Sequence, residues 1–195
     1  YQPNCLFYHN LQRADMRWGG SESGTVPYPS WGTFPYPSTG AGESAKEEIH
    51  ANNFALLKHG NPEGEYYMPA MSDAPLRGHG GHDWFSEREH ITYPLDNLVE
   101  MYYNSVGHNT TLILGVTPNP DGLIPEADAT RLIEFGEEIE SRFSNPIASN
   151  SGLGKIINLR LPENKTVNQV VIMEDIAQGE RVREFILEGK TTDGW

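Results

Sequence analysis

The sequence is short of several features that would each indicate a class of protein. It has a single cysteine, Cys5, which excludes an internal disulfide and leaves a small buried hydrophobe as its expected role. No apolar run approaches the roughly 20 residues that a membrane-spanning helix needs. Fourteen basic residues oppose 27 acidic ones without a basic cluster, for a formal charge of −13. We therefore expect neither nucleic acid nor a membrane as a partner.

What the sequence has instead is two long irregular stretches rich in glycine, proline and aromatic residues. The first runs to about Ser44 after a short apolar run, residues 5–8, which predicts a buried strand. The second covers residues 60–89. Disordered linkers are poor in aromatics, so packed functional loops are the better interpretation. Aromatic rings on irregular backbone suit sugars, whose apolar faces stack on the rings while polar neighbours bind the hydroxyls.

Helical and strand patterns alternate from Leu95 onward. Apolar residues at helical spacing predict a helix from Leu95 to a cap at Gly107, and the apolar run 110–116 predicts a buried parallel strand. Pro125 then opens a second helix that reaches Phe143. This order of strand, loop and helix predicts an α/β protein with a parallel sheet or barrel, whose chemistry lies at the carboxyl ends of the strands.

The pattern changes after Phe143. A Ser/Asn/Gly-rich connector is followed by three short runs, INLRL, VNQVVIM and REFILEG, separated by turn signals, which predicts an antiparallel β-sandwich. We therefore expect two parts, residues 1–143 and residues 144–195. Three strands are too few to close a sandwich, so we expect the second part to be incomplete and the natural protein to continue.

Three segments resemble the α-L-fucosidases of glycoside hydrolase family 29. They are LQRADMRWGGSESG at 11–24, YYMPAMSDAPLRG at 66–78, and MYYNSVGHNTTLILGVTPNPDGLIPEADATRLIEFG at 101–136. The resemblance implies that residues 1–143 are the C-terminal portion of a (β/α) TIM-like barrel. The stretch 149–189 is similar to the galactose-binding-like (F5/8 type C-like) sandwich often appended to these enzymes.

This resemblance implies a retaining exo-α-L-fucosidase that acts on terminal α-L-fucosides of glycans and is secreted or periplasmic. In a retaining mechanism one carboxylate attacks the sugar while a second carboxyl group acts as acid and then as base. Glu22 matches the family's general acid/base. The family's nucleophile is an aspartate in a Trp-Phe-Asp-Gly type motif on an earlier strand, and no such motif occurs here. We therefore expect the nucleophile upstream, and these 195 residues to be inactive alone.

The resemblance also implies four substrate-binding residues. Arg17 would orient a hydroxyl or carboxylate, although a surface salt bridge is an alternative. Trp18 would touch the sugar or pack beneath the loop. His82 would bind a hydroxyl, and Trp84 would line the C5-methyl side of fucose, with a core plug as the alternative for Trp84.

Several observations leave alternatives open. His79 and His82, together with the adjacent Asp83, suggest a metal site. They lack a third ligand at a characteristic spacing, so we expect no metal and no cofactor. Met71 stands where relatives often have glutamate, so a preference for branched fucosides is not carried over. Asp73 fits either a substrate contact or ordinary turn chemistry. A glycosidase for a related sugar such as an α-L-galactoside, and an inactive carbohydrate-binding protein on the same scaffold, remain as alternatives.

Overall fold

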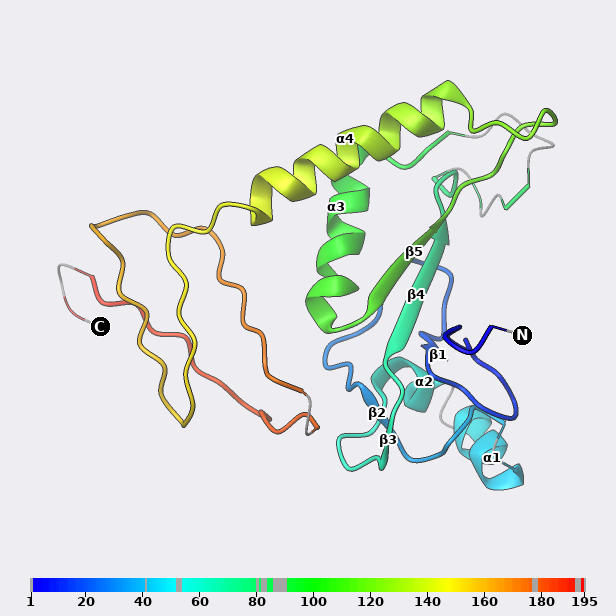
Figure 1. Cartoon of the computed structure of the whole chain (residues 1–195), viewed down its shortest axis with the longest axis horizontal. Helices are drawn as coiled ribbons and strands as arrows, with labels where there is room; N and C mark the ends of the chain where they lie inside the picture. Colours follow the sequence, from blue (N-terminus) through cyan, green and yellow to red (C-terminus); the bar gives the residue numbers. More distant parts are fainter. Residues whose placement is uncertain are drawn as a thin grey trace.

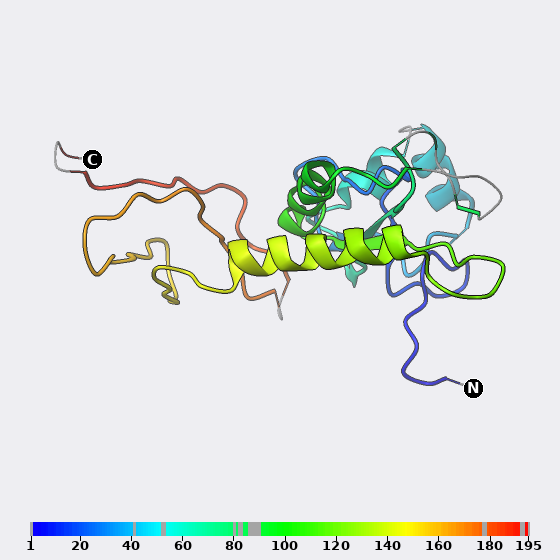
Figure 2. The same cartoon turned by 90° about the horizontal axis from the view of Figure 1, so that it is seen from above.

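The structure is a computed structural model that describes residues 2–40, 42–51, 54–79, 81, 84–85, 91–176, 179–191 and 194. All its helices and strands lie in the first 143 residues, with the rest of the chain extending beyond the end of the last helix (Figures 1 and 2). In chain order the elements are β1 (Arg17–Trp18), β2 (Thr33–Phe34), α1 (Glu43–Ala51), α2 (Ala55–His59), β3 (Tyr66–Tyr67), β4 (Ala70–Pro75), α3 (Leu95–Tyr103), the 3-10 turn η1 (Val106–His108), β5 (Thr111–Gly115) and α4 (Glu126–Phe143). Within the described ranges no helix combines the length and apolarity of a membrane span.

A parallel sheet in the order β1-β4-β5 organises this part of the chain. Arg17 pairs with Ala70, and Met71 pairs with Thr111, so β4 lies between the other two strands. Helices α3 and α4 follow β4 and β5, as a parallel sheet requires (Figure 1). The predicted α/β class with parallel strands is confirmed in this form, while the barrel and the sandwich stay predictions.

Strand β4 is the element that the sequence patterns missed, because we expected residues 60–89 to be a loop. Its sequence, AMSDAP, has no β-branched residue and ends in proline. Ala70, Ser72 and Ala74 are nonetheless almost fully buried, since β4 has a neighbour on each side. Pairing with β1 and β5 therefore outweighs a weak local strand propensity. Pro75 is tolerated because it is the last residue of the strand.

The helices cover the sheet through two apolar clusters. The first joins the sheet to α3 and α4; it contains Ala74, Leu76, Leu98 and Met101, with Leu112, Leu132 and Phe135 packed against it. The second lies around β2, α1 and α2, and contains Ala14, Phe34, Ile49, Leu56, Leu57 and Met68. Helix α4 matches the predicted bounds, but α3 does not run to Gly107. It stops at Tyr103 because the buried Ser105 hydroxyl donates to the Met101 carbonyl (2.6 Å), in place of a continued helical bond.

A buried ion pair fixes α4 against the end of β4. The Nε of Arg77 donates to both carboxylate oxygens of Asp128, at 2.8 and 3.1 Å. The side chains are 10% and 2% exposed. Asp128 also lies in the first turn of α4, where the helix dipole favours a negative charge. The pair thus adds a buried polar contact to the apolar packing of Leu132 and Phe135, and Asp128 is the one fully buried residue of α4.

The predicted strand at residues 5–8 is mostly absent. Only Tyr8 pairs, in an isolated parallel bridge with Met16 just before β1. Cys5 is exposed rather than buried, and Leu6 is 67% exposed. Arg13 lies over the Phe7 ring, 5.0 Å from its centre, but no apolar cluster includes this run. Its apolar side chains therefore stay largely exposed.

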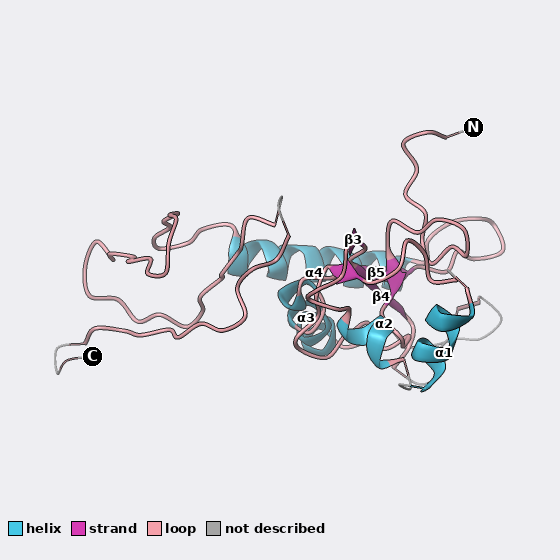
Figure 3. Cartoon of the chain, turned by 90° about the horizontal axis from the view of Figure 1, so that it is seen from below, coloured by secondary structure: helices cyan, strands magenta, loops and turns pink. Residues whose placement is uncertain are grey.

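The three strands predicted after Phe143 are also not formed. Apart from an isolated bridge between Thr191 and Gly194, the described residues of this segment contain no strand (Figure 3). Ile172 and Ile186 are 55% and 88% exposed. A sandwich strand is stabilised by a partner strand and by a second apolar sheet, and this segment has neither among the described residues.

Candidate active site

The Glu22 loop, residues 19–24, follows the carboxyl end of β1 and runs along the edge of β4. The N–H of Gly19 donates to the Met71 carbonyl (2.8 Å), and the N–H of Gly24 donates to the Asp73 carbonyl (2.9 Å). A Cβ on Gly24 would lie 2.9 Å from the Met101 sulfur, and its φ is +69°. Only glycine therefore lets the loop pass this close to α3. Glu22, between these two anchors, is exposed to solvent.

Two tryptophan indoles each donate to a carboxylate at this edge of the sheet. Trp84 Nε1 donates to Glu22 Oε2 (3.1 Å), and Trp18 Nε1 donates to Asp73 Oδ1 (2.9 Å). The Trp84 ring packs on the backbone of β5, since a Cβ on Gly115 would lie 2.4 Å from it. The position of Glu22 therefore depends on β1, on the chain after β4, and on β5.

Burial and neighbouring charges alter the titration of Asp73 and of a nearby tyrosine. Burial raises the pKa of Asp73, and the negative charge of Glu22 raises this pKa further, against the bond from Trp18. Burial also raises the pKa of Tyr8, with Asp73 and Glu22 adding to the effect. Burial lowers the pKa of His9, whose Nδ1 accepts the N–H of Trp18 (3.3 Å). The site thus holds two acidic groups beside a neutral phenol and a neutral imidazole, a set suited to proton transfer and to binding hydroxyl groups.

Comparison with known proteins gives this arrangement a family. No protein-family model matches the chain. A crystal structure from Bacteroides thetaiotaomicron, provisionally assigned as an α-L-fucosidase, is 54% identical with a TM-score of 0.76, over 85% of this chain and 37% of that one. The chain is α-L-fucosidase-like and is similar to the fucosidases of glycoside hydrolase family 29.

Other relatives of this α-L-fucosidase-like chain agree. A family 29 fucosidase from Ruminococcus gnavus in complex with fucose is 25% identical with a TM-score of 0.59, over 75% of this chain and 27% of that one. Alpha-L-fucosidase 1 of Arabidopsis thaliana is 27% identical over 98% of this chain and 42% of its own length. The chain thus spans less than half the length of these relatives.

The structure gives Arg17 a different role from the predicted substrate contact. The side chain has no exposed surface. Its Nε donates to the Leu57 carbonyl (2.8 Å), its Nη2 donates to the Trp31 carbonyl (2.8 Å), and its Nη1 donates to the Met68 carbonyl. Burial lowers the pKa of Arg17 to about 10. In the fucosidase-like site Arg17 is therefore a support that ties β1 to α2 and the Trp31 loop.

The other predicted site residues divide into two groups. Trp84 bonds to Glu22 directly, and Trp18 bonds to Asp73, whose pKa the Glu22 charge raises, whereas His82 lies outside the described residues. Trp18 is half-buried, with its ring edge-on to His9 and Phe54, so packing accounts for much of its surface. No cluster of three metal-ligating side chains occurs within the described ranges.

Tyr8 enters the site without having been predicted there, and Asp73 enters it after being left open between a substrate contact and a turn residue. Tyr8 is the last residue of the apolar run 5–8, which the sequence predicted to be a strand. Since catalytic groups lie at the carboxyl ends of parallel strands, this position indicated a place for Tyr8 in the site. Asp73 required knowledge of β4, because a carboxylate in an unrecognised strand looks like a turn residue.

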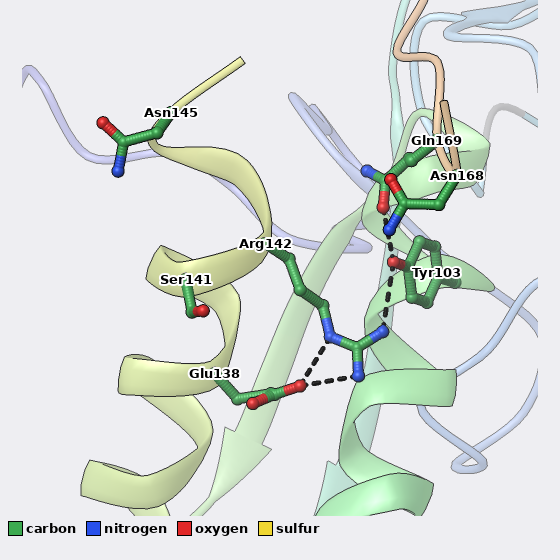
Figure 4. A pocket seen from close by; sticks show the side chains of 7 residues that line it. All are labelled: Tyr103, Glu138, Ser141, Arg142, Asn145, Asn168 and Gln169. Atoms are coloured by element: carbon green, nitrogen blue, oxygen red, sulfur yellow. Dashed lines mark hydrogen bonds and ion pairs between the residues drawn. The ribbon is translucent and has the colours of Figure 1, made fainter. Parts of the chain in front are cut away.

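A pocket of about 520 Å³ lies elsewhere, between α3, α4 and the C-terminal segment (Figure 4). Its lining is polar and consists of Tyr103, Glu138, Ser141, Arg142, Asn145, Asn168 and Gln169. Arg142 and Glu138 form an ion pair (2.6 Å), and the Tyr103 hydroxyl donates to Gln169 Oε1 (2.7 Å). The pocket lining includes neither Glu22 nor Trp18, Asp73 or Trp84. The pocket therefore marks where the C-terminal segment meets the helices rather than the active site.

Gly60 supports the Arg17 contacts, and its replacement tests them. Its φ is +64°, and a Cβ there would lie 2.5 Å from the Trp31 carbonyl oxygen and 2.9 Å from Arg17 Nη2. We expect Gly60→Ala to lower the free energy of unfolding of the complete protein by about 2 kcal/mol or more, measured by urea denaturation. Gly122→Ala is the matched control, because Gly122 has φ +78° but nothing within 4 Å. Equal losses in the two variants would contradict the predicted collision.

Proposed function

We propose that the complete protein is a retaining exo-α-L-fucosidase that hydrolyses terminal α-L-fucosides of glycans, with Glu22 as the general acid/base. The observation that carries this proposal is the bond from Trp84 to Glu22 at the carboxyl edge of the sheet, in a chain that is 54% identical to a structure provisionally assigned as an α-L-fucosidase. The nucleophile is an aspartate that precedes this sequence.

The reaction proceeds in two steps. The nucleophilic carboxylate attacks the anomeric carbon while Glu22, as the acid, gives its proton to the departing glycosidic oxygen. Glu22, now a carboxylate, takes a proton from the attacking water, which displaces the nucleophile from the anomeric carbon and restores both groups. No cofactor is needed. Trp84 holds the Glu22 carboxyl in one orientation and leaves its other oxygen free for the proton.

The substrate is a fucosylated oligosaccharide or glycoconjugate. The Ruminococcus gnavus relative was crystallised with fucose, which supports a fucose-sized site. By the family resemblance, the Trp84 ring provides the apolar wall that favours the C5-methyl group, Trp18 contacts the sugar and His82 binds a hydroxyl. Asp73 adds a hydrogen-bond acceptor close to Trp18.

The domain and export predictions also stand as proposals. Residues 1–143 form the last part of a (β/α) barrel, which the parallel β1-β4-β5 sheet supports. Residues 144–195 begin a galactose-binding-like sandwich, and the protein is secreted or periplasmic, as the family resemblance implies.

Aryl glycosides of α-L-fucose and α-L-galactose test the substrate proposal in the complete protein. The two sugars differ by one hydroxyl on C6, so we expect kcat/KM for the fucoside to be higher by roughly tenfold or more. Equal rates would replace the fucosidase with an enzyme for a related sugar. Fucose binding without turnover of either glycoside would indicate an inactive carbohydrate-binding protein.

A further inference from the structure

The C-terminal segment contacts the sheet-bearing part through Glu180. The Glu180 carboxylate accepts the N–H of Gly32 (2.7 Å) and a side-chain N–H of Asn109. Gly32 allows this approach, since a Cβ there would lie 3.2 Å from Glu180 Oε1. Burial raises the pKa of Glu180, with Glu174 adding to the effect, while Arg17 and the two hydrogen bonds lower it. The carboxylate is thus partly removed from water in a specific contact.

Arg183 strengthens the same contact. Its guanidinium lies 4.7 Å from the centre of the Trp31 ring and donates to the Pro62 carbonyl (3.1 Å). It also donates to Glu63 Oε1 (3.2 Å) and to the carbonyl of Glu180 itself (2.8 Å). Two charged residues of the C-terminal segment, Glu180 and Arg183, therefore contact the turn at Trp31.

One peptide unit joins Glu180 to the buried Arg17. The carbonyl of Trp31 accepts from Arg17 Nη2 (2.8 Å), and the N–H of the next residue, Gly32, donates to Glu180. The peptide dipole thus has a cation at its oxygen and an anion at its hydrogen. The Glu180 charge acts on Arg17 and opposes the lowering of its pKa by burial.

This geometry matters because Arg17 is a buried charge whose hydrogen-bond acceptors, within the part of the chain that the structure describes, include no carboxylate. Besides three carbonyls it contacts the Ser30 hydroxyl (3.3 Å). A buried cation is costly unless a negative charge compensates it. Arg17 belongs to β1, and the loop that carries Glu22 begins at the next residue but one, Gly19.

We propose that Glu180 is the counter-ion of Arg17 across the Trp31–Gly32 peptide, and that this pairing makes the C-terminal segment a positioning element for the Glu22 loop. The first half of this proposal, the counter-ion role, concerns stability alone. The second half, the positioning role, rests on the proposed fucosidase function.

Charge-removing variants of the complete protein test the first half. We expect Glu180→Gln to raise the unfolding equilibrium constant by about tenfold or more, nearly as much as Glu180→Ala, because glutamine keeps an acceptor for Gly32 but loses the charge. In an Arg17→Met background, Glu180→Gln should change the logarithm of the unfolding equilibrium constant by less than about half as much as it does in the wild type. Glu188→Gln, an exposed glutamate on the same segment, is the control and should leave the constant unchanged. Full retention of stability in Glu180→Gln would overturn the counter-ion role, whether or not Arg17→Met folds.

Steady-state kinetics test the second half. A displaced Glu22 loop should lower kcat of Glu180→Gln by roughly tenfold with KM changed less than about twofold, since the Glu180 carboxylate bonds to Gly32 and Asn109 rather than to the Glu22 loop, and a shift near 1 Å costs up to about 100-fold. Unchanged kcat in a destabilised Glu180→Gln variant would overturn the positioning role. If the wild type shows no fucosidase activity, the proposed function fails, the positioning role fails with it, and the unfolding measurements still decide the counter-ion role.

Discussion

Glu22→Gln lowers kcat/KM of the complete enzyme on a natural fucosylated oligosaccharide by roughly 10²- to 10⁴-fold, as expected for loss of a general acid/base. Glutamine neither gives nor takes the proton, but its Oε1 still accepts from Trp84 Nε1, so the loop geometry of the variant is preserved. The loss should be smallest for the glycosylation step of aryl fucosides, whose leaving groups need little protonation. Initial rates on both substrate types measure the difference.

A matched control and a rescue experiment sharpen this result. Glu137→Gln removes an exposed carboxylate on α4 and should leave kcat/KM unchanged. Azide should partly restore turnover of Glu22→Ala and yield a fucosyl azide, because a small anion attacks a glycosyl-enzyme without base catalysis. Near-normal activity of Glu22→Gln on the oligosaccharide would remove Glu22 from its role.

The largest expected loss of stability follows from Asp128→Ala, which lowers the free energy of unfolding by about 3–5 kcal/mol. The change leaves the Arg77 guanidinium 10% exposed without its carboxylate, and it removes the bond between α4 and the end of β4. Urea denaturation at neutral pH, followed by far-UV circular dichroism, measures the change.

Two comparisons separate the ion pair from other effects of the substitution. Glu126→Ala removes another acid from the first turn of α4, one that is exposed, so it tests the helix dipole alone and should cost about 0.3–1 kcal/mol. The double variant Arg77→Met/Asp128→Leu replaces both charges with apolar groups and should be far more stable than Asp128→Ala. A double variant as unstable as the single one would show that packing at this site, rather than the unpaired charge, dominates.

The sequence patterns were most reliable where short-range periodicity decides the structure. The strand β5 and the helix α4 lie where their apolar patterns placed them. The predicted burial of β5 was wrong, since none of its residues is fully buried and Ile113 is 45% exposed. The end of α3 was wrong because the Ser105 hydroxyl, not the more obvious Gly107, ends the helix. Strand β4 was missed because its burial comes from neighbours on both sides, which its own residues do not indicate.

The same contrast between local sequence patterns and long-range contacts applies to the active site. Glu22 could be named from its own segment, since RWGGSESG resembles a loop with a known role. The role of Arg17 could not, because an arginine in a loop is equally compatible with a surface, a ligand or the interior. Its burial depends on carbonyls of Trp31, Leu57 and Met68, which approach it only after β1, α2 and the chain between them have packed.

The sequence by itself determined the α/β alternation, the family resemblance and the candidate acid/base, because each depends on residues close together in the chain. Only the tertiary structure decided which side chains meet. Trp84 reaches Glu22 across 62 residues, Trp18 reaches Asp73 across 55, and Glu180 reaches Gly32 across 148. Such contacts follow from the pairing of strands and the packing of segments on them, so no local pattern encodes them.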